Sequence, residues 1–427
     1  MNILDFSIIF AKAIFGVAFC LGLVPILVWL ERKFSAFIQD RVGPNRASVY
    51  SFRLAGMFHI IADVIKLFFK EDIDPKNVNK FYFYLGPLLI GAVALMTFAT
   101  IPFADTLKLG HKVINMQILN IDAGILWFLA ISSFSVYGII LAAWGSNNKF
   151  SFLGGLRSSA QMLSYEIPMG LSIIGILMVF GTVHLNDIVI QQGNLIWGFI
   201  PMWGIFVQPI SGLILIVCAF AETNRTPFDL VEGESELVGG YHTEYGSMKF
   251  GMLFMSEYIS MVVIASVVVT LFFGGWQIPY LPTNKILENS SFLIQAFSII
   301  SAIICFIASY ILYKYHVSFM GKWKDIRDYE GLIFSILFIF IALFFIASFL
   351  IVHFVTMPLW VAPIFAVLIQ IGAFAVKVAL FCALFVWVRW TLPRFRYDQL
   401  LSLSWKSLLP LSLLNIFVTG LVILLLK

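Results

Sequence analysis

Long apolar segments recur along the whole chain, and no other sequence feature limits its fold as strongly. A helix needs about 20 apolar residues to cross the hydrocarbon core of a bilayer. Soluble domains are about 45–50% apolar, whereas this chain of 427 residues is 61% hydrophobic and 12% charged. The sequence therefore predicts an all-α, polytopic integral membrane protein with about ten transmembrane helices. The expected spans are 6–30, 81–103, 120–144, 158–181, 196–220, 247–273, 289–315, 331–355, 360–390 and 406–426.

The loops between these spans differ in positive charge. Most Lys and Arg residues lie in the loops after the odd-numbered spans, and these loops are 31–80, 145–157, 221–246, 316–330 and 391–405. The loops and termini on the opposite side hold four: Lys108, Lys112, Lys285 and Lys427. Cytoplasmic loops carry the excess of Lys and Arg. We therefore expect the first set of loops in the cytoplasm and both termini outside it.

Several classes of site lack the residues they need. Each of the four cysteines is isolated in an apolar run, whereas iron–sulfur and zinc sites need clustered thiolates. We expect no metal site on this chain and interpret Cys20, Cys218, Cys305 and Cys382 as small buried hydrophobic residues. The sequence has no basic run interleaved with aromatic residues, so we expect no nucleic acid binding. It also has no hydrolytic motif or phosphate-binding glycine loop.

Six ionisable residues fall inside or at the ends of the predicted spans. A charge at membrane depth costs a few kcal/mol, so such groups usually face the bundle interior, pair with one another or line a water-filled path. The alternative is that side chains near helix ends extend to the interface, which is the simpler interpretation for the arginine. The six residues are Asp122, Glu166, Glu222, Glu257, Lys377 and Arg389.

Three cytoplasmic loops combine charge with turn residues and apolar residues. The loop "AETNRTPFDLVEGESELVGGYHTEYG" (221–246) holds six acids and one base, whereas "ERKFSAFIQDRVGPNRAS" (31–48) and "RWTLPRFRYDQL" (389–400) are rich in Arg. Opposite charges on one face favour a paired, partly buried network, and Gly and Pro turns fix the backbone. We therefore expect a structured face that meets another protein. A membrane-surface patch is the alternative, although it would not need the acids.

The segment "GMFHIIADVIKLFFK" (56–70) has apolar residues at helical spacing but is too short and too charged to span. Two interpretations remain open at this stage. The segment is either an amphipathic helix in the membrane interface or the lining of a cavity beneath the helix bundle.

The polar loops carry motifs that are similar to those of one family. These motifs are "ERKFSAFIQDRVGPN", "IADVIKLFFKED", "VYGIILAAWGSNNKFSFLGGLRSSAQMLSYE", "NRTPFDLVEGESELVGGYHTEY", "LFFGGWQ" and "LPRFRYDQLLSLSWKSLLPL". In this order they resemble the H-type membrane subunit of NADH:quinone oxidoreductase, respiratory complex I, also called the NADH dehydrogenase subunit 1 family. The resemblance covers most of residues 5–282 and 370–426.

This resemblance implies a subunit that joins the membrane arm to the peripheral arm of a proton-pumping translocase and is not catalytic alone. The subunit would form much of a chamber for the quinone headgroup and the start of a buried acidic path that couples quinone reduction to proton pumping. By resemblance, the residues at the chamber and its loops are Glu31, Arg41, Asp63, Lys66, Lys70, Glu222, Arg225, Asp229, Glu232, Glu234, Glu236 and Arg389. The candidates for the proton path are Asp122, Glu166, Glu257 and Lys377.

The resemblance also implies cofactors and partners. Quinone, either ubiquinone or menaquinone, would be the substrate, while FMN and the iron–sulfur clusters would lie on partner subunits. The expected partners are the peripheral-arm subunits that carry the terminal iron–sulfur cluster and the quinone-site fold, the small membrane subunits A, J and K, and lipid. The expected location is the bacterial inner membrane, with both termini in the periplasm.

One segment departs from the family pattern. Family members usually have eight core spans, and here about 85 extra residues, with two apolar spans and the loop "KYHVSFMGKWKDIRDYEG", precede the last core helices. We therefore expect a core at 1–284, an inserted two-helix segment at 285–370 and C-terminal core helices at 371–427. Two added helices leave the final loop on the same side, so eight core spans become ten.

Two other function classes remain as alternatives. The chain would also suit the membrane anchor of a related energy-converting hydrogenase, although the full loop motifs favour quinone chemistry. A stand-alone secondary transporter is less favoured, because the sequence shows no clear internal repeat of the kind that many transporters have.

Overall fold

The computed structural model describes residues 3–50, 52–110, 112–229, 238–319, 326–354 and 358–426. Within these ranges, nine helices or runs of joined helices are long and apolar enough to cross a membrane, which confirms the predicted all-α membrane fold. They comprise α1 (Ile3–Ile38), α3 (Lys80–Thr97), α4 (Gly124–Gly145), α5 (Lys149–Phe180), α10 (Ser247–Phe272), α12 (Ser290–Phe319), α13 (Glu330–Phe354), α14 (Val361–Thr391), and α15 (Tyr397–Ser402), which continues through η5 (Leu403–Leu408) into α16 (Leu409–Leu426).

The fifth predicted span, 196–220, is the one whose form differs most from the expectation. Its membrane helix is the 14-residue α8 (Pro209–Glu222), which starts later and is too short to span alone. The preceding residues form the strand pair β3 (Leu195–Ile196) and β4 (Ile200–Pro201) and the short helix α7 (Gly204–Val207). The physical reason is local, because Pro209 lacks an amide proton and is favoured at the first position of a helix.

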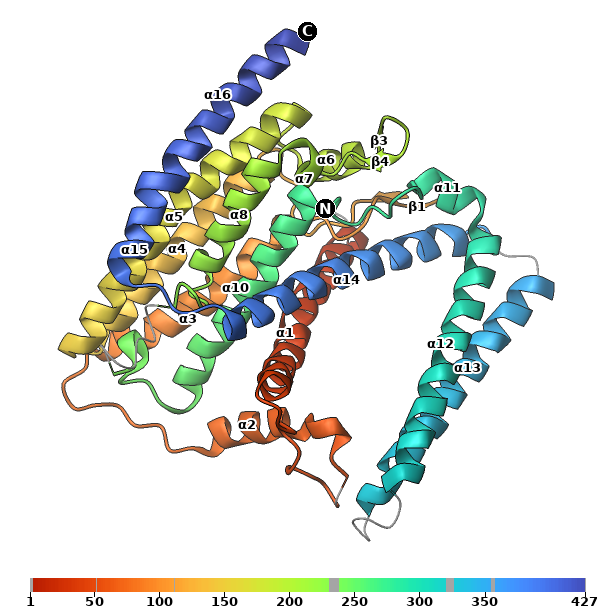
Figure 1. Ribbon diagram of the computed structural model, residues 1–427, viewed down its shortest axis with the longest axis horizontal. Coiled ribbons are helices and arrows are strands. Elements are labelled where there is room, and N and C mark those ends of the chain that lie inside the picture. Colours follow the sequence, from red (N-terminus) through yellow and green to blue (C-terminus); the bar gives the residue numbers. More distant parts are fainter. Residues whose placement is uncertain are drawn as a thin grey trace.

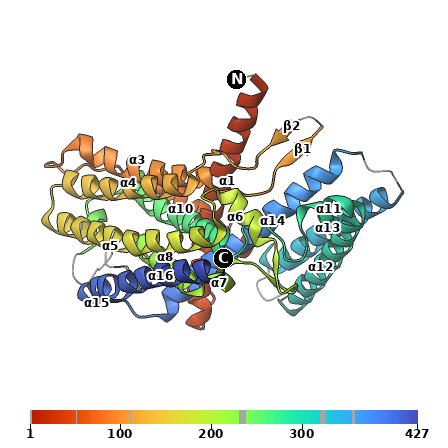
Figure 2. The ribbon, with the colours of Figure 1, turned by 90° about the horizontal axis from the view of Figure 1, so that it is seen from above.

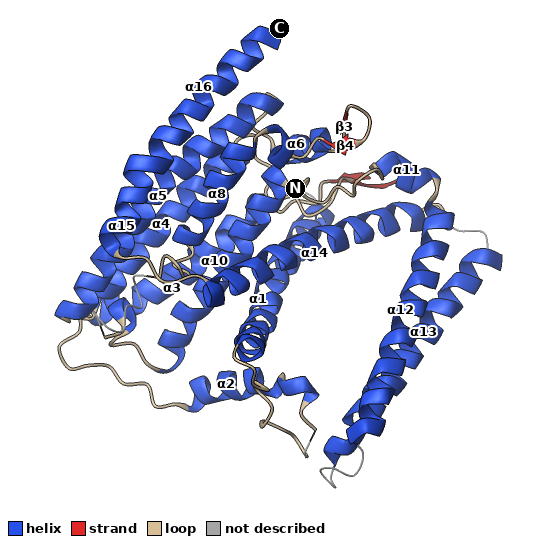
Figure 3. Ribbon diagram, viewed as in Figure 1, coloured by secondary structure: helices blue, strands red, loops and turns tan. Residues whose placement is uncertain are grey.

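Most of the membrane helices form one bundle. Figure 1 shows α3, α4, α5, α8, α10 and α16 running side by side, with α1 and α14 crossing next to α10. The view in Figure 2 places the pair α12 and α13 to one side of this bundle. The strands that the structure describes form two short hairpins, which are red in Figure 3. One is the pair of β3 and β4, and the other is the pair of β1 (Leu107–Leu109) and β2 (Lys112–Ile114).

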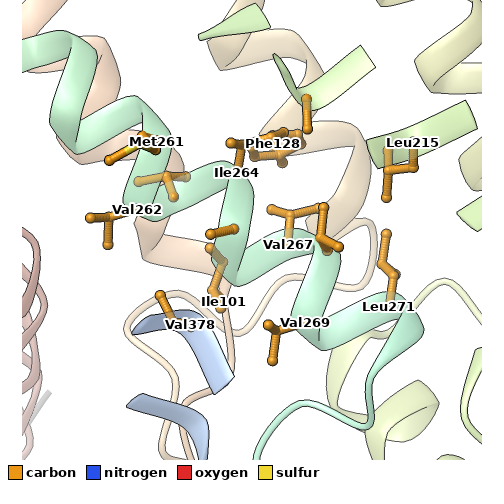
Figure 4. Close-up of a cluster of buried hydrophobic side chains, with 14 of the residues drawn as sticks. Ile101, Phe128, Leu215, Met261, Val262, Ile264, Val267, Val269, Leu271 and Val378 are labelled. Atoms are coloured by element: carbon orange, nitrogen blue, oxygen red, sulfur yellow. The ribbon is translucent and has the colours of Figure 1, made fainter. Parts of the chain in front are cut away.

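Helix α10 is the centre of the bundle. Nearly every side chain from Ser256 to Phe272 is buried. Figure 4 shows Met261, Ile264 and Leu271 of this helix among side chains from several other elements. Because these side chains are buried, other elements of the chain, and not lipid, surround this part of α10.

Helices α12 and α13 form a separate antiparallel hairpin. Polar contacts join the two helices at Ser298 with Ser348 and at Ser309 with Ser335, each with a 2.8 Å distance between hydroxyl oxygens. Phe297 of α12 also contacts Phe365 of α14, with ring centres 6.4 Å apart. The domain boundaries at 284 and 370 stay a prediction.

Helix α2 (Phe58–Phe69) crosses one end of the molecule, and both chain termini lie on the side away from it (Figure 1). None of its side chains is buried, which fits both an amphipathic helix in the membrane interface and the lining of a cavity, so both interpretations stay predictions. The remaining short elements are η1 (Leu54–Gly56), η2 (Phe98–Thr100), α6 (Leu185–Gln192), η3 (Gly240–His242), α11 (Thr283–Glu288) and η4 (Ile326–Tyr329).

Candidate functional site: a buried charge network

A buried arginine lies at the centre of the candidate site. Arg225 follows α8 directly and is only 4% exposed. Its Nη1 lies 3.6 Å from Glu31 Oε2, and its Nη2 lies 4.0 Å from Glu257 Oε2. Its guanidinium carbon is also 4.1 Å from the centre of the Tyr258 ring. Two acids and one aromatic ring therefore compensate a charge that would otherwise be costly to bury.

These partners also affect the pKa of Arg225. Burial by itself lowers the pKa of a guanidinium group. At Arg225 the opposing influence of Tyr258, Glu31 and Glu257 is larger, so its pKa lies above the ordinary value. Arg225 is consequently a fixed positive charge next to two carboxyl groups.

Glu31 connects three membrane helices. Its Oε1 lies 2.7 Å from Nη1 of Arg389, which belongs to the C-terminal end of α14. Its Oε2 accepts a hydrogen bond of 2.8 Å from the hydroxyl of Tyr258 on α10. Because Glu31 itself belongs to α1, this one side chain joins α1, α10 and α14 at the base of the bundle.

Glu257 extends the network toward the loop that precedes α10. The Tyr241 hydroxyl donates to its Oε1 across 3.5 Å, and His242 Nε2 lies 3.6 Å from the same atom. Burial lowers the pKa of His242 to about 4, so its imidazole is neutral at pH 7. A neutral imidazole and a phenol therefore lie beside the Glu257 carboxyl group.

A cavity of about 50 Å³ begins at Glu257 and reaches Glu222 at the end of α8. This volume is large enough for water. Apolar side chains such as Phe128 and Val263 close part of its wall. Its polar lining consists of Thr97, Ser132, Ser135, Glu222, Thr223, Asn224, Tyr241, Ser256, Glu257 and Ser260.

A third acid lies beside this polar region. Glu166 of α5 accepts a hydrogen bond from Ser133 of α4, whose neighbour Ser132 lines the cavity. Glu257 of α10 and Glu222 of α8 line the cavity itself, whereas Glu166 is not part of its lining. One predicted proton-path residue, Glu257, therefore shares a cavity with the predicted chamber residue Glu222.

The charged loops pair as the sequence predicted. Asp229 in the acid-rich loop is buried and lies 3.0 Å from Nη2 of Arg394, and the amide of Phe395 donates to the carbonyl of Pro227. Together with the contacts of Glu31 to Arg225 and Arg389, these bonds join all three loops. The expectation of a structured, charge-paired face is confirmed for the described residues.

Other predicted chamber residues lie outside the network. Asp63 of α2 pairs with Arg32 at 2.6 Å, one residue from Glu31, while the Lys66 side chain is exposed and lies 3.9 Å from Asp63. Lys70 and Arg41 are also exposed, at the end of α2 and in the loop after α1. The predicted residues Glu232, Glu234 and Glu236 lie outside the described residues.

Two predicted proton-path residues lie away from the three acids. The Asp122 side chain is 96% exposed before α4, 3.7 Å from His184. Lys377 of α14 donates to the carbonyls of the turn after α10, at 2.7–3.0 Å. The three carbonyls are those of Phe273, Gly275 and Gln277. Lys377 therefore binds the turn at the C-terminal end of α10, whereas Glu257 lies in the N-terminal half of that helix.

Sequence reasoning did not identify three residues of the network, Tyr258, Tyr241 and His242. Tyr258 follows Glu257 in a helix, and adjacent helical residues point in different directions, so their shared role was not visible. Tyr241 and His242 lie in the motif "GGYHTEY", where their position beside the acids was the only available signal.

The fold and the site together define a class of protein. It is a multi-pass membrane protein in which loops of one face close a buried charge network over an acid-lined cavity. A family described as NADH dehydrogenase matches residues 11–326 and 325–420. The chain belongs to this family and is a membrane subunit of an NADH-quinone oxidoreductase, complex I, with other subunits of that complex as its partners.

Named relatives support this assignment. A Flavobacterium psychrophilum protein, named as the H-type subunit of NADH-quinone oxidoreductase, is 39% identical over 99% of this chain and 100% of its own length. A Solibacter usitatus protein, named as the first H-type subunit of the same enzyme, is 40% identical over 98% of both chains. NADH-quinone oxidoreductase subunit 8 of Rhodothermus marinus is 40% identical over 93% of this chain and 91% of its own length.

Proposed function

We propose that this subunit forms the chamber in which the quinone headgroup is reduced and the first part of a proton path leading from it. The network of Glu31, Arg225 and Glu257 is the observation that carries the proposal. It begins at the face formed by the three charged loops and continues through Glu257 into the cavity at Glu222. The chain would lie in a bacterial inner membrane with this face in the cytoplasm and both termini in the periplasm.

The chemistry of quinone reduction explains why such a network is useful. Conversion of a quinone to a quinol takes up two electrons and two protons, so the local charge changes during the reaction. Acids that lie close together inside a protein cannot all be ionised at low cost, and their protonation states depend on one another. A change at the chamber would therefore alter the protonation of Glu257 and then of Glu222 and Glu166.

The electrons would come from partner subunits. FMN and the iron–sulfur clusters would lie on those subunits, with the terminal cluster next to the charged loops. The small membrane subunits A, J and K would continue the acid path into the membrane arm. The names of the relatives, all quinone oxidoreductases, support a quinone as the electron acceptor over the protons that a hydrogenase would reduce.

Replacement of Glu257 by Gln in the intact complex tests this function. The substitution keeps the shape of the side chain and removes its ability to ionise, so quinone reductase activity and proton pumping should both fall by about tenfold or more. Electron transfer from NADH to an artificial acceptor should be unchanged. Glu288→Gln, at an exposed side chain at the end of α11, outside the three charged loops, is the matched control. Normal quinone reduction and pumping in the Glu257 variant would refute the proposal.

The acids at 232 and 234 allow a parallel test. By resemblance they belong to the chamber loop, so we expect Glu232→Gln or Glu234→Gln to impair quinone reduction and pumping together. Normal values for both activities would exclude these acids from the function.

A further inference from the structure

The α12–α13 hairpin is clamped to the loop between α1 and α2 by a buried ion pair. The guanidinium Nε and Nη2 of Arg53 lie 3.3 and 3.2 Å from Glu330 Oε2, and the backbone amide of Arg53 donates to Oε1 of the same carboxylate. Both residues are buried, at 9% and 8% exposure. Beside the pair, the rings of Phe52 and Phe334 are 5.7 Å apart. The contact therefore resembles an interior one more than a surface salt bridge.

The hairpin side of this clamp is a rigid anchor. Glu330 is the first residue of α13, where the helix dipole favours a negative charge. A Cβ at Gly331 would lie 2.9 Å from the Leu312 carbonyl oxygen, so glycine lets α12 and α13 approach closely at this end. His316 Nδ1 of α12 also lies 2.5 Å from the carbonyl oxygen of Asp328 in η4, two residues before Glu330. Contacts with α12 therefore support the start of α13 on both sides of Glu330.

The loop side is compact and connects directly to α1 and α2. The indole of Trp29 on α1 donates to the Ala55 carbonyl, at 3.1 Å. The amides of Arg46 and Ala47 donate to His59 Nε2 on α2, at 3.1 and 3.2 Å. A Cβ at Gly56, where φ is +89°, would lie 2.1 Å from the Pro44 carbonyl oxygen. Residues 44–50 and 52–57, which we call the strap, are therefore tied to α1, to α2 and to each other by bonded and close contacts.

Helix α2 leads from the strap to the charge network. Asp63 of α2 lies 2.6 Å from Arg32, the neighbour of Glu31 in α1. A series of contacts thus runs from Glu330 through the strap and α2 to Arg32, the residue after Glu31 in α1. All side chains of α2 are at least partly exposed. Because the helix has little packing of its own, its position depends on contacts at its ends and along one face.

We infer that Glu330 is a positioning residue for the quinone site, and that the α12–α13 hairpin is a brace that holds the strap and α2 in register with Glu31. This inference rests on the proposed quinone chamber. It gives the α12–α13 hairpin a structural role in addition to contact with lipid. If the hairpin acts as a brace, weakening the contact between Arg53 and Glu330 should change the apparent KM for quinone more than kcat.

The test uses the purified intact complex with Glu330→Gln, which keeps side-chain shape and removes the negative charge. Hydrogen exchange of the strap amides should become faster. The apparent KM for short-chain ubiquinone or menaquinone analogues should rise about threefold to tenfold with kcat within about twofold, because small displacements of positioning groups have effects of this size or larger. Electron transfer from NADH to an artificial acceptor should not change.

Two further variants show whether the clamp is the cause. Arg53→Met should raise KM in the same direction, and the double variant should be no worse than Glu330→Gln, because both substitutions break one contact. If the increases in KM caused by the two single substitutions multiply in the double variant, the inference is overturned. Ser335→Ala, which perturbs the hairpin through the contact with Ser309 and leaves the clamp intact, should keep KM unchanged. An equal rise in that variant would also overturn it.

The outcomes separate this inference from the proposed function. If Glu31→Gln leaves quinone KM unchanged, the proposed chamber is wrong. If Glu31→Gln raises KM but Glu330→Gln changes neither strap exchange nor KM, the brace alone is refuted. Faster strap exchange with unchanged KM refutes the positioning role as well. If Glu330→Gln prevents assembly, Arg53→Lys, which keeps the charge but not the two-pronged contact, replaces it in the same measurements.

Discussion

Arg389 near the end of α14 and Glu31 of α1 form a direct ion pair, with 2.7 Å between Nη1 and Oε1, although they lie near opposite ends of the chain. The pair connects a C-terminal core helix to the first helix. It also positions Glu31 against Tyr258 and Arg225, so the geometry of the site depends on a contact that closes the whole fold.

Arg389→Gln should therefore weaken both the site and the fold. We expect stability to fall by about 1–2 kcal/mol, because a hydrogen bond to a charged group is lost while Glu31 keeps two other partners. The apparent KM for quinone should rise. Thermal unfolding of the detergent-solubilised complex and steady-state kinetics measure the two effects. Arg396→Gln, at a side chain that is 80% exposed, should change stability by less than about 0.5 kcal/mol; equal effects would contradict the prediction.

Asp63→Asn should raise the apparent quinone KM without a large loss of stability. The pair with Arg32 is partly exposed, so its contribution to stability is within about 1 kcal/mol. Its loss nevertheless frees α2 next to Glu31. Quinone kinetics should change while transfer to an artificial acceptor stays normal. Asp5→Asn, which removes a similarly exposed ion pair with Lys112 (3.6 Å) far from α2, is the control and should have little effect. An unchanged KM for Asp63→Asn would argue against a role of α2 in the site.

Two glycines of α3 should respond in opposite ways to alanine. A Cβ at Gly86 would lie 2.7 Å from Cα and Cβ of Ala142, so Gly86→Ala must separate α3 from α4 and should cost about 1–3 kcal/mol. Gly91 has open space around the same position, so Gly91→Ala should be neutral or stabilising by up to about 1 kcal/mol. Thermal unfolding of the two variant complexes gives the comparison. A similar loss in both would exclude close helix packing as the cause.

The stability of the subunit should fall as pH decreases from 6.5 toward 4. Burial lowers the pKa of His242 from 6.5 to about 4, so in this window the unfolded chain binds a proton that the folded chain does not. The stabilisation is complete above pH 6.5 and declines below it, by at most on the order of 3 kcal/mol. Glu257, Tyr241 and the Phe250 ring face this imidazole.

The midpoint of thermal unfolding, followed against pH in the solubilised complex, measures this dependence. His242→Gln cannot titrate and should flatten the profile between pH 6.5 and 4. His353→Gln, at an exposed position of α13, should leave the profile as it is. A profile that is equally steep in the His242 variant would assign the pH dependence to other groups.

Much of the membrane topology was predictable because transmembrane length and apolar character are local properties of a segment. The hydrophobic runs predicted ten membrane segments, and the loop charges predicted which loops share a face. The acid-rich loop was also identified correctly as a partner of the Arg-rich loops, since Asp229 pairs with Arg394. The fifth span differed because Pro209 delays the start of its helix, which apolar length alone does not reveal.

Only the tertiary structure determines which charged residues of the site contact one another. Glu222 and Glu257 line one cavity, whereas Asp122 and Lys377, which looked equivalent to Glu257 in sequence, lie apart from it. Likewise, no local pattern predicted that Glu330 would clamp Arg53. Segment hydrophobicity determines that a helix enters the membrane, but the rotation of each helix and its packing against distant helices determine which buried charges meet.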